Sequence, residues 1–72
     1  MNKIYKTSDI GLLIKKKRNE LNMTQPQLAN ISGNGIRFIS DLENGKKTMQ
    51  IGKVLDIIHI LGFDLVISAR GD

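Results

Sequence analysis

Cysteine is absent from this 72-residue chain, and histidine occurs once, at position 59. Without cysteine the chain has no disulfide bonds and no thiolate metal ligands, a composition that fits a reducing compartment. His59 lies in an apolar stretch, with no second imidazole or thiol to complete a metal site. No spacing indicates a nucleophile with an oriented base. We therefore expect no enzymatic activity, no catalytic residues, no metal and no cofactor.

Long apolar runs are also missing. No stretch approaches the ~18 apolar residues that a helix needs to cross a bilayer. No basic-then-apolar signal segment opens the sequence. We therefore expect a cytoplasmic protein that does not bind membranes, and nothing in the sequence indicates a small-molecule ligand.

What is present is one small domain with a modest basic excess. Seventy-two residues leave room for a single thin core, which favours association with a partner subunit. Eleven Lys and Arg against seven Asp and Glu give a net charge of +4. That excess suits contacts with phosphates, but an ordinary soluble protein can carry it as well.

The most informative segment, residues 24–45, begins with a short helix. Its first residues, Thr24-Gln-Pro-Gln27, fit a capping box with a proline in the first turn, where a missing N–H breaks no helical bond. Leu28 and Ile31 are expected to form the inward stripe of this helix, because they are three positions apart.

A tight turn and a second short helix follow. Residues 33–35, Gly-Asn-Gly, end the first helix, since glycine and asparagine tolerate positive φ. The second helix covers about residues 35–43, with Ile39 and Leu42 pointing inward, and Asn44-Gly45 ends it. Two short helices across such a turn predict a helix-turn-helix, whose second helix can enter a DNA major groove.

One more helix is predicted on each side of this segment. The first covers about residues 9–21, after Thr7, Ser8 and Asp9, which are all good N-caps. The last covers about residues 49–61 with Thr48 as its cap, and its apolar residues occupy more than one face. Part of that helix is therefore expected to pack on something outside its own small core.

The end of the chain carries a different pattern. After Gly62, residues 63–69 alternate between apolar and polar and are rich in β-formers, which predicts a strand. A lone strand needs a partner, either the N-terminal arm or another chain. We expect an all-α domain of four to five helices over residues 9–62, an N-terminal arm over 1–8, and a C-terminal strand and tail over 63–72.

The outward residues around the turn are the candidate site. Arg37 is suited to a bidentate pair with guanine O6 and N7, and Ile36 to a thymine methyl group. The alternative interpretation is that these are ordinary solvent-exposed residues of a helical domain without a role in binding. We expect Gly35, Ile36, Arg37 and Ser40 to face DNA bases, and Gln25, Lys46 and Lys47 to contact phosphates.

These residues resemble those of the Cro/C1-type helix-turn-helix repressors of the XRE family, over about residues 10–62. The matching positions are Gln25, Leu28-Ala29, Gly33, Ile39-Ser40, Leu42-Glu43 and Asn44-Gly45-Lys46. Residues 37–48, followed by 53–55 and 61–65, look more narrowly like HipB-type antitoxins. The resemblance implies a lambda-repressor-like fold and a homodimer that binds double-stranded palindromic operator DNA. It also implies repression of its own operon and a HipA-type kinase toxin as partner.

The resemblance also implies roles for residues outside the turn. The family often has an ion pair between the first and third helices, at the positions of Arg18 and Glu43. Its C-terminal strand pairs with the copy in the other subunit, which would place Val54, Ile58, Leu61, Phe63, Leu65 and Ile67 in a dimer interface. The chain departs from the family at Pro26, where Glu is common, and at Asp41, where many relatives have a base-reading polar residue. We leave Asp41 out of the predicted site.

Two other functions fit the same sequence. The first is a free-standing repressor without a toxin, which the neighbouring gene would distinguish. The second is a protein-interaction module that keeps the fold but no longer binds DNA. Such a module would have an acidic or apolar outward face on its third helix, and Arg37, Lys46 and Lys47 argue against it.

Overall fold

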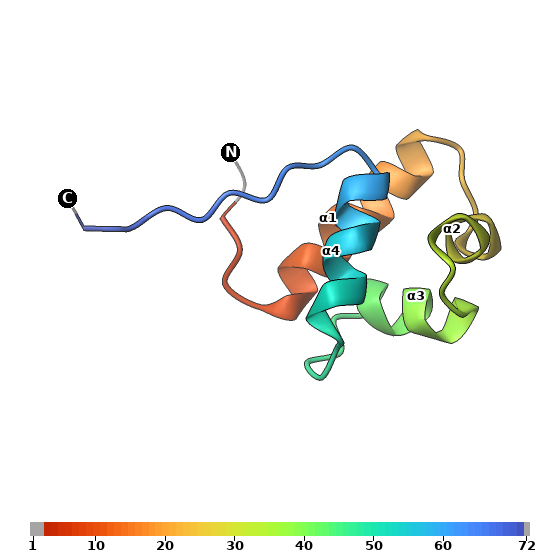
Figure 1. Ribbon diagram of the computed structural model, residues 1–72, viewed down its shortest axis with the longest axis horizontal. Helices are drawn as coiled ribbons and strands as arrows, with labels where there is room; N and C mark the ends of the chain where they lie inside the picture. The colour runs from red at the N-terminus through yellow and green to blue at the C-terminus, as the bar shows by residue number, and fades with distance from the viewer. Residues whose placement is uncertain (1–2, 72) are drawn as a thin grey trace.

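Four helices joined by short connections make up the computed structural model of the chain, which describes residues 3–71 (Figure 1). They are α1 (Thr7–Glu20), α2 (Gln25–Ser32), α3 (Ile36–Glu43) and α4 (Ile51–Ile60). The predicted all-helical fold with a helix-turn-helix is confirmed for this part of the chain. No helix within it is long and apolar enough to cross a membrane.

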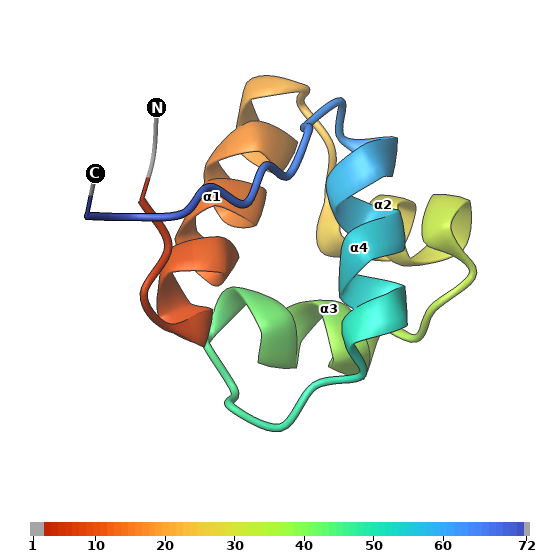
Figure 2. The ribbon, with the colours of Figure 1, turned by 60° about the vertical axis from the view of Figure 1, so that its left-hand side comes forward.

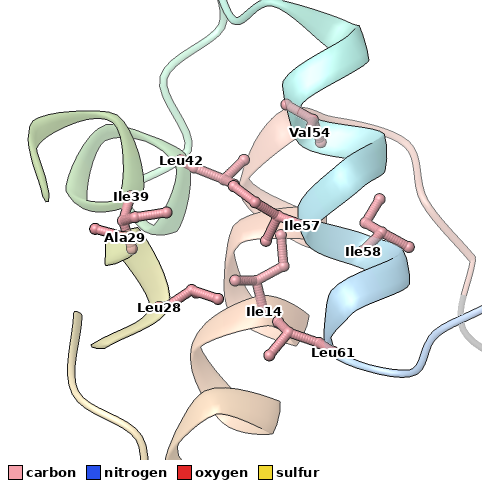
Figure 3. Packing of buried hydrophobic residues seen from close by; sticks show 9 residues of the cluster. All are labelled: Ile14, Leu28, Ala29, Ile39, Leu42, Val54, Ile57, Ile58 and Leu61. Atoms are coloured by element: carbon pink, nitrogen blue, oxygen red, sulfur yellow. The ribbon is translucent and has the colours of Figure 1, made fainter. Parts of the chain in front are cut away.

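All four helices contribute to one hydrophobic core (Figure 3). Its buried side chains are Ile14 of α1, Leu28 and Ala29 of α2, Ile39 and Leu42 of α3, Val54, Ile57 and Ile58 of α4, and Leu61. α3 packs against both α1 and α2, and α2 also contacts α4 (Figure 2). The inward side of α3 is thus fixed by its neighbours, while its opposite side is left to the solvent.

The start of α1 differs from the prediction. The helix begins at Thr7, two residues early, and its N-cap is Lys6 rather than Thr7, Ser8 or Asp9. The Asp9 carboxylate lies in the first turn, where its Oδ2 accepts hydrogen bonds from the backbone N–H of Tyr5 at 2.9 Å and of Lys6 at 3.1 Å. A carboxylate at this position satisfies amides at the positive end of the helix dipole.

The start of α2 follows the prediction, but one inward residue does not. Thr24 is the N-cap, with the Thr24 and Gln27 side chains each bonded to the other's backbone N–H. Ile31 is 57 % exposed, whereas Leu28 and Ala29 are buried. The buried face is centred between positions 28 and 29, so Ile31 lies roughly 110° away from its middle at 100° per residue. The assignment of Ile31 to the inward stripe was wrong.

The start of α4 also differs from the prediction. The helix begins at Ile51 with Gln50 as N-cap, and Thr48, the predicted cap, is an exposed loop residue. The loop runs back along α3 before α4 begins (Figure 2). Residues 46–50 are therefore used to span this distance, and Met49 packs against the core on the way.

The predicted C-terminal strand is not formed in the chain. Residues 3–71 contain no β-strand, and residues 63–71 leave α4 as an extended tail (Figure 1). After Phe63, whose N–H bonds to the carbonyl of Ile58, the structure gives no backbone hydrogen bond from the tail to the N-terminal arm. A strand exists only with a partner to complete its ladder, and the described part of the chain supplies none. Met1, Asn2 and Asp72 lie outside the described residues.

Candidate nucleic-acid interface

The turn between α2 and α3 sets the angle at which α3 leaves the body of the protein. Gly33 ends α2 in the left-handed region, with φ 72°, a conformation that side chains resist. The Asn34 N–H bonds to the carbonyl of Ala29 at 3.0 Å, which closes the last turn of α2. Gly35 then caps α3, and its carbonyl accepts from the N–H groups of Phe38 and Ile39.

The outward side of α3 presents the predicted base-reading residues. Ile36 and Arg37 are exposed, and the Arg37 side chain reaches 89 % exposure. Ser40 is half-buried on the same helix, with its Oγ accepting from Asn44 Nδ2 at 3.4 Å. Because Ile39 and Leu42 fill the core on the opposite side, α3 cannot rotate to hide this surface.

Gly35 leaves open space at the N-terminus of α3. Its φ is −75°, which any residue adopts, and a Cβ built there meets nothing within 4 Å. Neither the backbone conformation nor the chain's own packing therefore requires glycine at this position. The exposed backbone of Gly35 permits an approach by another molecule that a side chain would obstruct.

Arg18 and Glu43 join α1 to the end of α3 through a buried bidentate pair. Arg18 Nε donates to Glu43 Oε2 at 2.6 Å and Nη2 donates to Oε1 at 2.9 Å. Their side chains are only 9 % and 2 % exposed. Arg18 Nη1 also donates to the carbonyl of Met23 at 2.8 Å, so one guanidinium fixes both the loop before α2 and the end of α3.

The surroundings shift the pKa values of both partners so that both stay charged. Burial raises the pKa of the Glu43 carboxylate, whereas the hydrogen bonds from Arg18 and Gln25 lower this pKa. The lowering influences outweigh burial, and the net pKa is therefore below the usual value. The hydrogen bond to Glu43 raises the pKa of Arg18 above its usual value.

Gln25 belongs to this network. Its Nε2 donates to Glu43 Oε1 at 3.1 Å, which holds the amide in place at the start of α2. The second amide hydrogen of the same nitrogen remains for an outside acceptor. The network thus places one predicted phosphate contact on a fixed support.

Close backbone packing fixes α1 against α3 and the loop that follows it. A Cβ on Gly11 would lie 2.8 Å from the Glu43 carbonyl oxygen and closer still to that of Leu42. Near the other end of this contact, Thr7 Oγ1 donates to the carbonyl of Gly45 at 2.8 Å. Gly45 has φ 79° and lies against Ser8, so a side chain there would be strained and crowded.

Asp41 is the residue near the site that the sequence reasoning left out. Its Oδ1 lies 3.3 Å from Arg37 Nε, and its Oδ2 lies 3.6 Å from Lys46 Nζ. The sequence could have indicated the pair with Arg37, because residues four positions apart on a helix are neighbours. The third predicted cation, Lys47, is exposed on the same loop.

Lys53 was also missed. It is an exposed residue of α4, and its Nζ lies 5.6 Å from the centre of the Phe38 ring of α3, within the range of a cation–π contact. This contact places a further positive charge beside α3. No local pattern of residues indicated this contact, because the two residues are far apart along the chain.

The residues predicted for a dimer interface separate into three groups by burial. Val54, Ile58 and Leu61 are buried in the core of the chain itself. Phe63 is half-buried, with Lys17 Nζ 5.6 Å from the centre of its ring. Leu65 and Ile67 are exposed in the tail, Ile67 to 91 %. The apolar side chains that α4 leaves exposed are Ile51 and Ile60.

Comparison with known proteins agrees with this geometry. A helix-turn-helix family model (HTH_3) matches residues 14–67, which include all of α2, α3 and α4. The chain belongs to the helix-turn-helix family of DNA-binding regulators. It is 49 % identical over 70 residues to an uncharacterized HTH-type transcriptional regulator, y4mF, of Sinorhizobium fredii (strain NBRC 101917 / NGR234), covering 97 % of this chain and 92 % of that protein.

Solved structures share the fold at low sequence identity. A HipB–O4 20mer complex has a TM-score of 0.86, and a HipA–HipB–O2–O3 complex has 0.87, each at 22 % identity. Each comparison covers 99 % of this chain and 100 % of the matched chain. A structure titled MDT Protein is equally similar, with a TM-score of 0.87 at 22 % identity.

Proposed function

We propose that this chain is a homodimeric repressor that binds a palindromic operator and serves as the antitoxin of a HipA-type kinase toxin. One observation carries the DNA-binding part. The core and the Arg18–Glu43 pair hold one side of α3 in place, and its other side presents an exposed Arg37. The exposed Lys46 and Lys47 follow in the loop after α3. A short helix held in this way is suited to entering the major groove with its N-terminal half.

Each side chain of the proposed interface has a role that its chemistry suggests. Arg37 reads a guanine, Ile36 contacts a thymine methyl group, and Ser40 reaches a base edge. Gly35 lets the backbone come close to the DNA. Gln25, Lys46 and Lys47 contact phosphates, which fixes the register without reading sequence.

The experiment is selection of bound DNA from a random pool, followed by binding measurements on the selected site. Arg37→Ala should lower specific affinity by about 1–3 kcal/mol, mainly at one base pair. Lys47→Ala should weaken binding to all sequences and flatten the dependence on salt concentration. Failure to enrich any sequence would refute the proposal, and equal weakening by Arg37→Ala on all sequences would make it a phosphate contact.

A dimer supplies what one copy lacks, because one Arg and one Ile read few bases. Two copies placed one helical turn apart, about 34 Å, would read two half-sites. The tail offers a means of pairing, since its backbone has no ladder partner among residues 3–71 and Leu65, Val66 and Ile67 are exposed. Pairing with the same segment of a second copy would cover these groups.

Shortening the tail tests this pairing. A chain that ends at Asp64 keeps Phe63, which packs against the core, and loses the exposed apolar residues. We expect it to sediment as a monomer while the full chain sediments as a dimer. A shortened chain that still dimerises would move the interface to another surface, such as Ile51 and Ile60 of α4.

The antitoxin part rests on the sequence resemblance to HipB-type proteins and is supported by fold similarity to chains in the HipB–O4 20mer and HipA–HipB–O2–O3 complexes. The competing function is a repressor without a toxin. The test is co-purification of the chain with the product of the neighbouring gene. Absence of a kinase-like neighbour, and of any co-purifying kinase, would leave only the repressor function.

A further inference from the structure

We propose that Asp41 is a positioning residue for DNA reading, which orients the Arg37 guanidinium toward the bases and connects it to Lys46. This inference rests on the proposed DNA-binding function of α3. It assigns a role to an acidic side chain that lies within a surface otherwise suited to phosphates.

The Asp41 carboxylate contacts two cationic side chains from different parts of the fold. Asp41 Oδ1 accepts a hydrogen bond from Nε of Arg37, one helical turn earlier, at 3.3 Å. Its Oδ2 lies 3.6 Å from Nζ of Lys46, which belongs to the loop after α3. The Asp41 side chain is 24 % exposed, less than either of the two longer side chains that it contacts.

An unpaired carboxylate at this position would oppose DNA binding, because it would repel phosphates. Here the charge is shared between Arg37 and Lys46, and the three side chains together carry a net charge of +1. The surface therefore stays positive, and the Asp41 carboxylate can orient the Arg37 side chain without making the surface acidic.

The hydrogen bond to Asp41 decides which N–H groups of the Arg37 guanidinium are available to a DNA base. Among the described residues, Arg37 is hydrogen-bonded through Nε alone. Its terminal Nη1 and Nη2 groups remain on a side chain that is 89 % exposed. Two parallel N–H groups at the end of an arginine match the two acceptors of guanine, O6 and N7. Asp41 thus occupies the inner part of the guanidinium and leaves the outer fork for the base.

The pair is weak in water and stronger in a complex. An exposed pair four positions apart on a helix biases the side chain only about twofold. Once DNA excludes water from the surface, the attraction between the charges increases. Arginine is also rich in rotamers, and a side chain that is already oriented loses less freedom when it binds.

The experiment measures binding of the full chain to its selected DNA site and to sites changed at each base pair, for Asp41→Asn, Arg37→Ala and the double variant. Asp41→Asn should reduce discrimination at the base pair read by Arg37 by about threefold to tenfold. The same variant should bind non-specific DNA more tightly, because one negative charge is lost. In the Arg37→Ala background, Asp41→Asn should no longer change discrimination.

Glu20→Gln is the matched control, since it removes an exposed carboxylate near the end of α1, away from α3. It should leave discrimination at every base pair unchanged. Thermal unfolding of each variant verifies that the chain is folded.

Four results would overturn the inference. Equal tightening on all sequences by Asp41→Asn would make Asp41 only a charge. Lost discrimination at a different base pair would make it a direct reader of cytosine or adenine. Discrimination that depends on Arg37 but not on Asp41 would remove the positioning role and leave the proposed function intact. If Arg37→Ala itself changes no discrimination, Arg37 is a phosphate contact and Asp41 has no base-reading side chain to orient, whereas the proposed function fails only if the random pool yields no enriched sequence.

Discussion

Replacing Gly11 by alanine should destabilise the protein, although alanine favours helices. Gly11 lies within α1, where exchange of glycine for alanine ordinarily stabilises by up to ~1 kcal/mol. Here the added Cβ would lie 2.8 Å from the Glu43 carbonyl oxygen and closer to that of Leu42. Both atoms belong to the backbone of α3, so no side chain can turn aside, and α1 and α3 must separate.

The size of the effect follows from this clash. Overpacking costs about 1–3 kcal/mol, and contact with backbone places Gly11→Ala at the upper end of that range. After subtraction of the ~1 kcal/mol gained in helix propensity, a net loss of about 2 kcal/mol remains. For a domain of this size, that loss lowers Tm by roughly 8–16 °C. Separation of the helices also stretches the bonds between Arg18 and Glu43.

Thermal and urea unfolding followed by circular dichroism measure the effect. Gly52→Ala is the matched control, because Gly52 is also helical but a Cβ there meets nothing within 4 Å. It should raise stability by up to ~1 kcal/mol. The two variants should therefore shift Tm in opposite directions. If Gly11→Ala is as stable as the parent chain, the close packing of α1 on α3 does not exist in solution.

Three further predictions concern the buried pair and the turn. Glu43→Ala should cost about 3–5 kcal/mol in urea unfolding by leaving the Arg18 charge buried alone, and Arg18→Met with Glu43→Leu should recover most of it; equal losses in both variants would contradict this. Because the pKa of Glu43 is lowered on folding, its stabilisation should be complete above about pH 4.3 and lost as the pH falls below that value, with a weaker pH dependence in Glu43→Ala. Gly35→Ala should leave the free energy of unfolding within about 0.5 kcal/mol of the parent and weaken binding to the selected DNA; unchanged affinity would exclude close backbone approach.

Local signals predicted the central segment well. The capping box at Thr24 and Gln27 satisfies amides a few residues away, and the glycine turn after α2 needs only positive φ at one residue. Such interactions are complete within one stretch of chain, so the residue types reveal them. The outward position of Arg37 followed similarly, from the helical period and the inward Ile39 and Leu42.

The errors arose where another part of the protein decides the outcome. Thr48 is a good cap by type, but the loop must run back along α3 before α4 can begin. Ile31 is apolar and correctly spaced from Leu28, yet Ala29 shares the buried face and turns Ile31 outward. The strand predicted after Gly62 finds no partner within residues 3–71, and hydrogen bonding to a second strand is not a local property.

The helical class, the helix-turn-helix and the charges near the turn follow from the order of residues, because these features depend on neighbours within a few positions. Which groups converge depends instead on the tertiary structure. It brings Arg18 of α1 and Gln25 of α2 to one carboxylate at the end of α3. It also places α1 so close to α3 that only glycine fits at position 11. Finally, it places Asp41 between Arg37 and Lys46. These contacts depend on the distances between packed helices, which the order of residues along the chain does not specify.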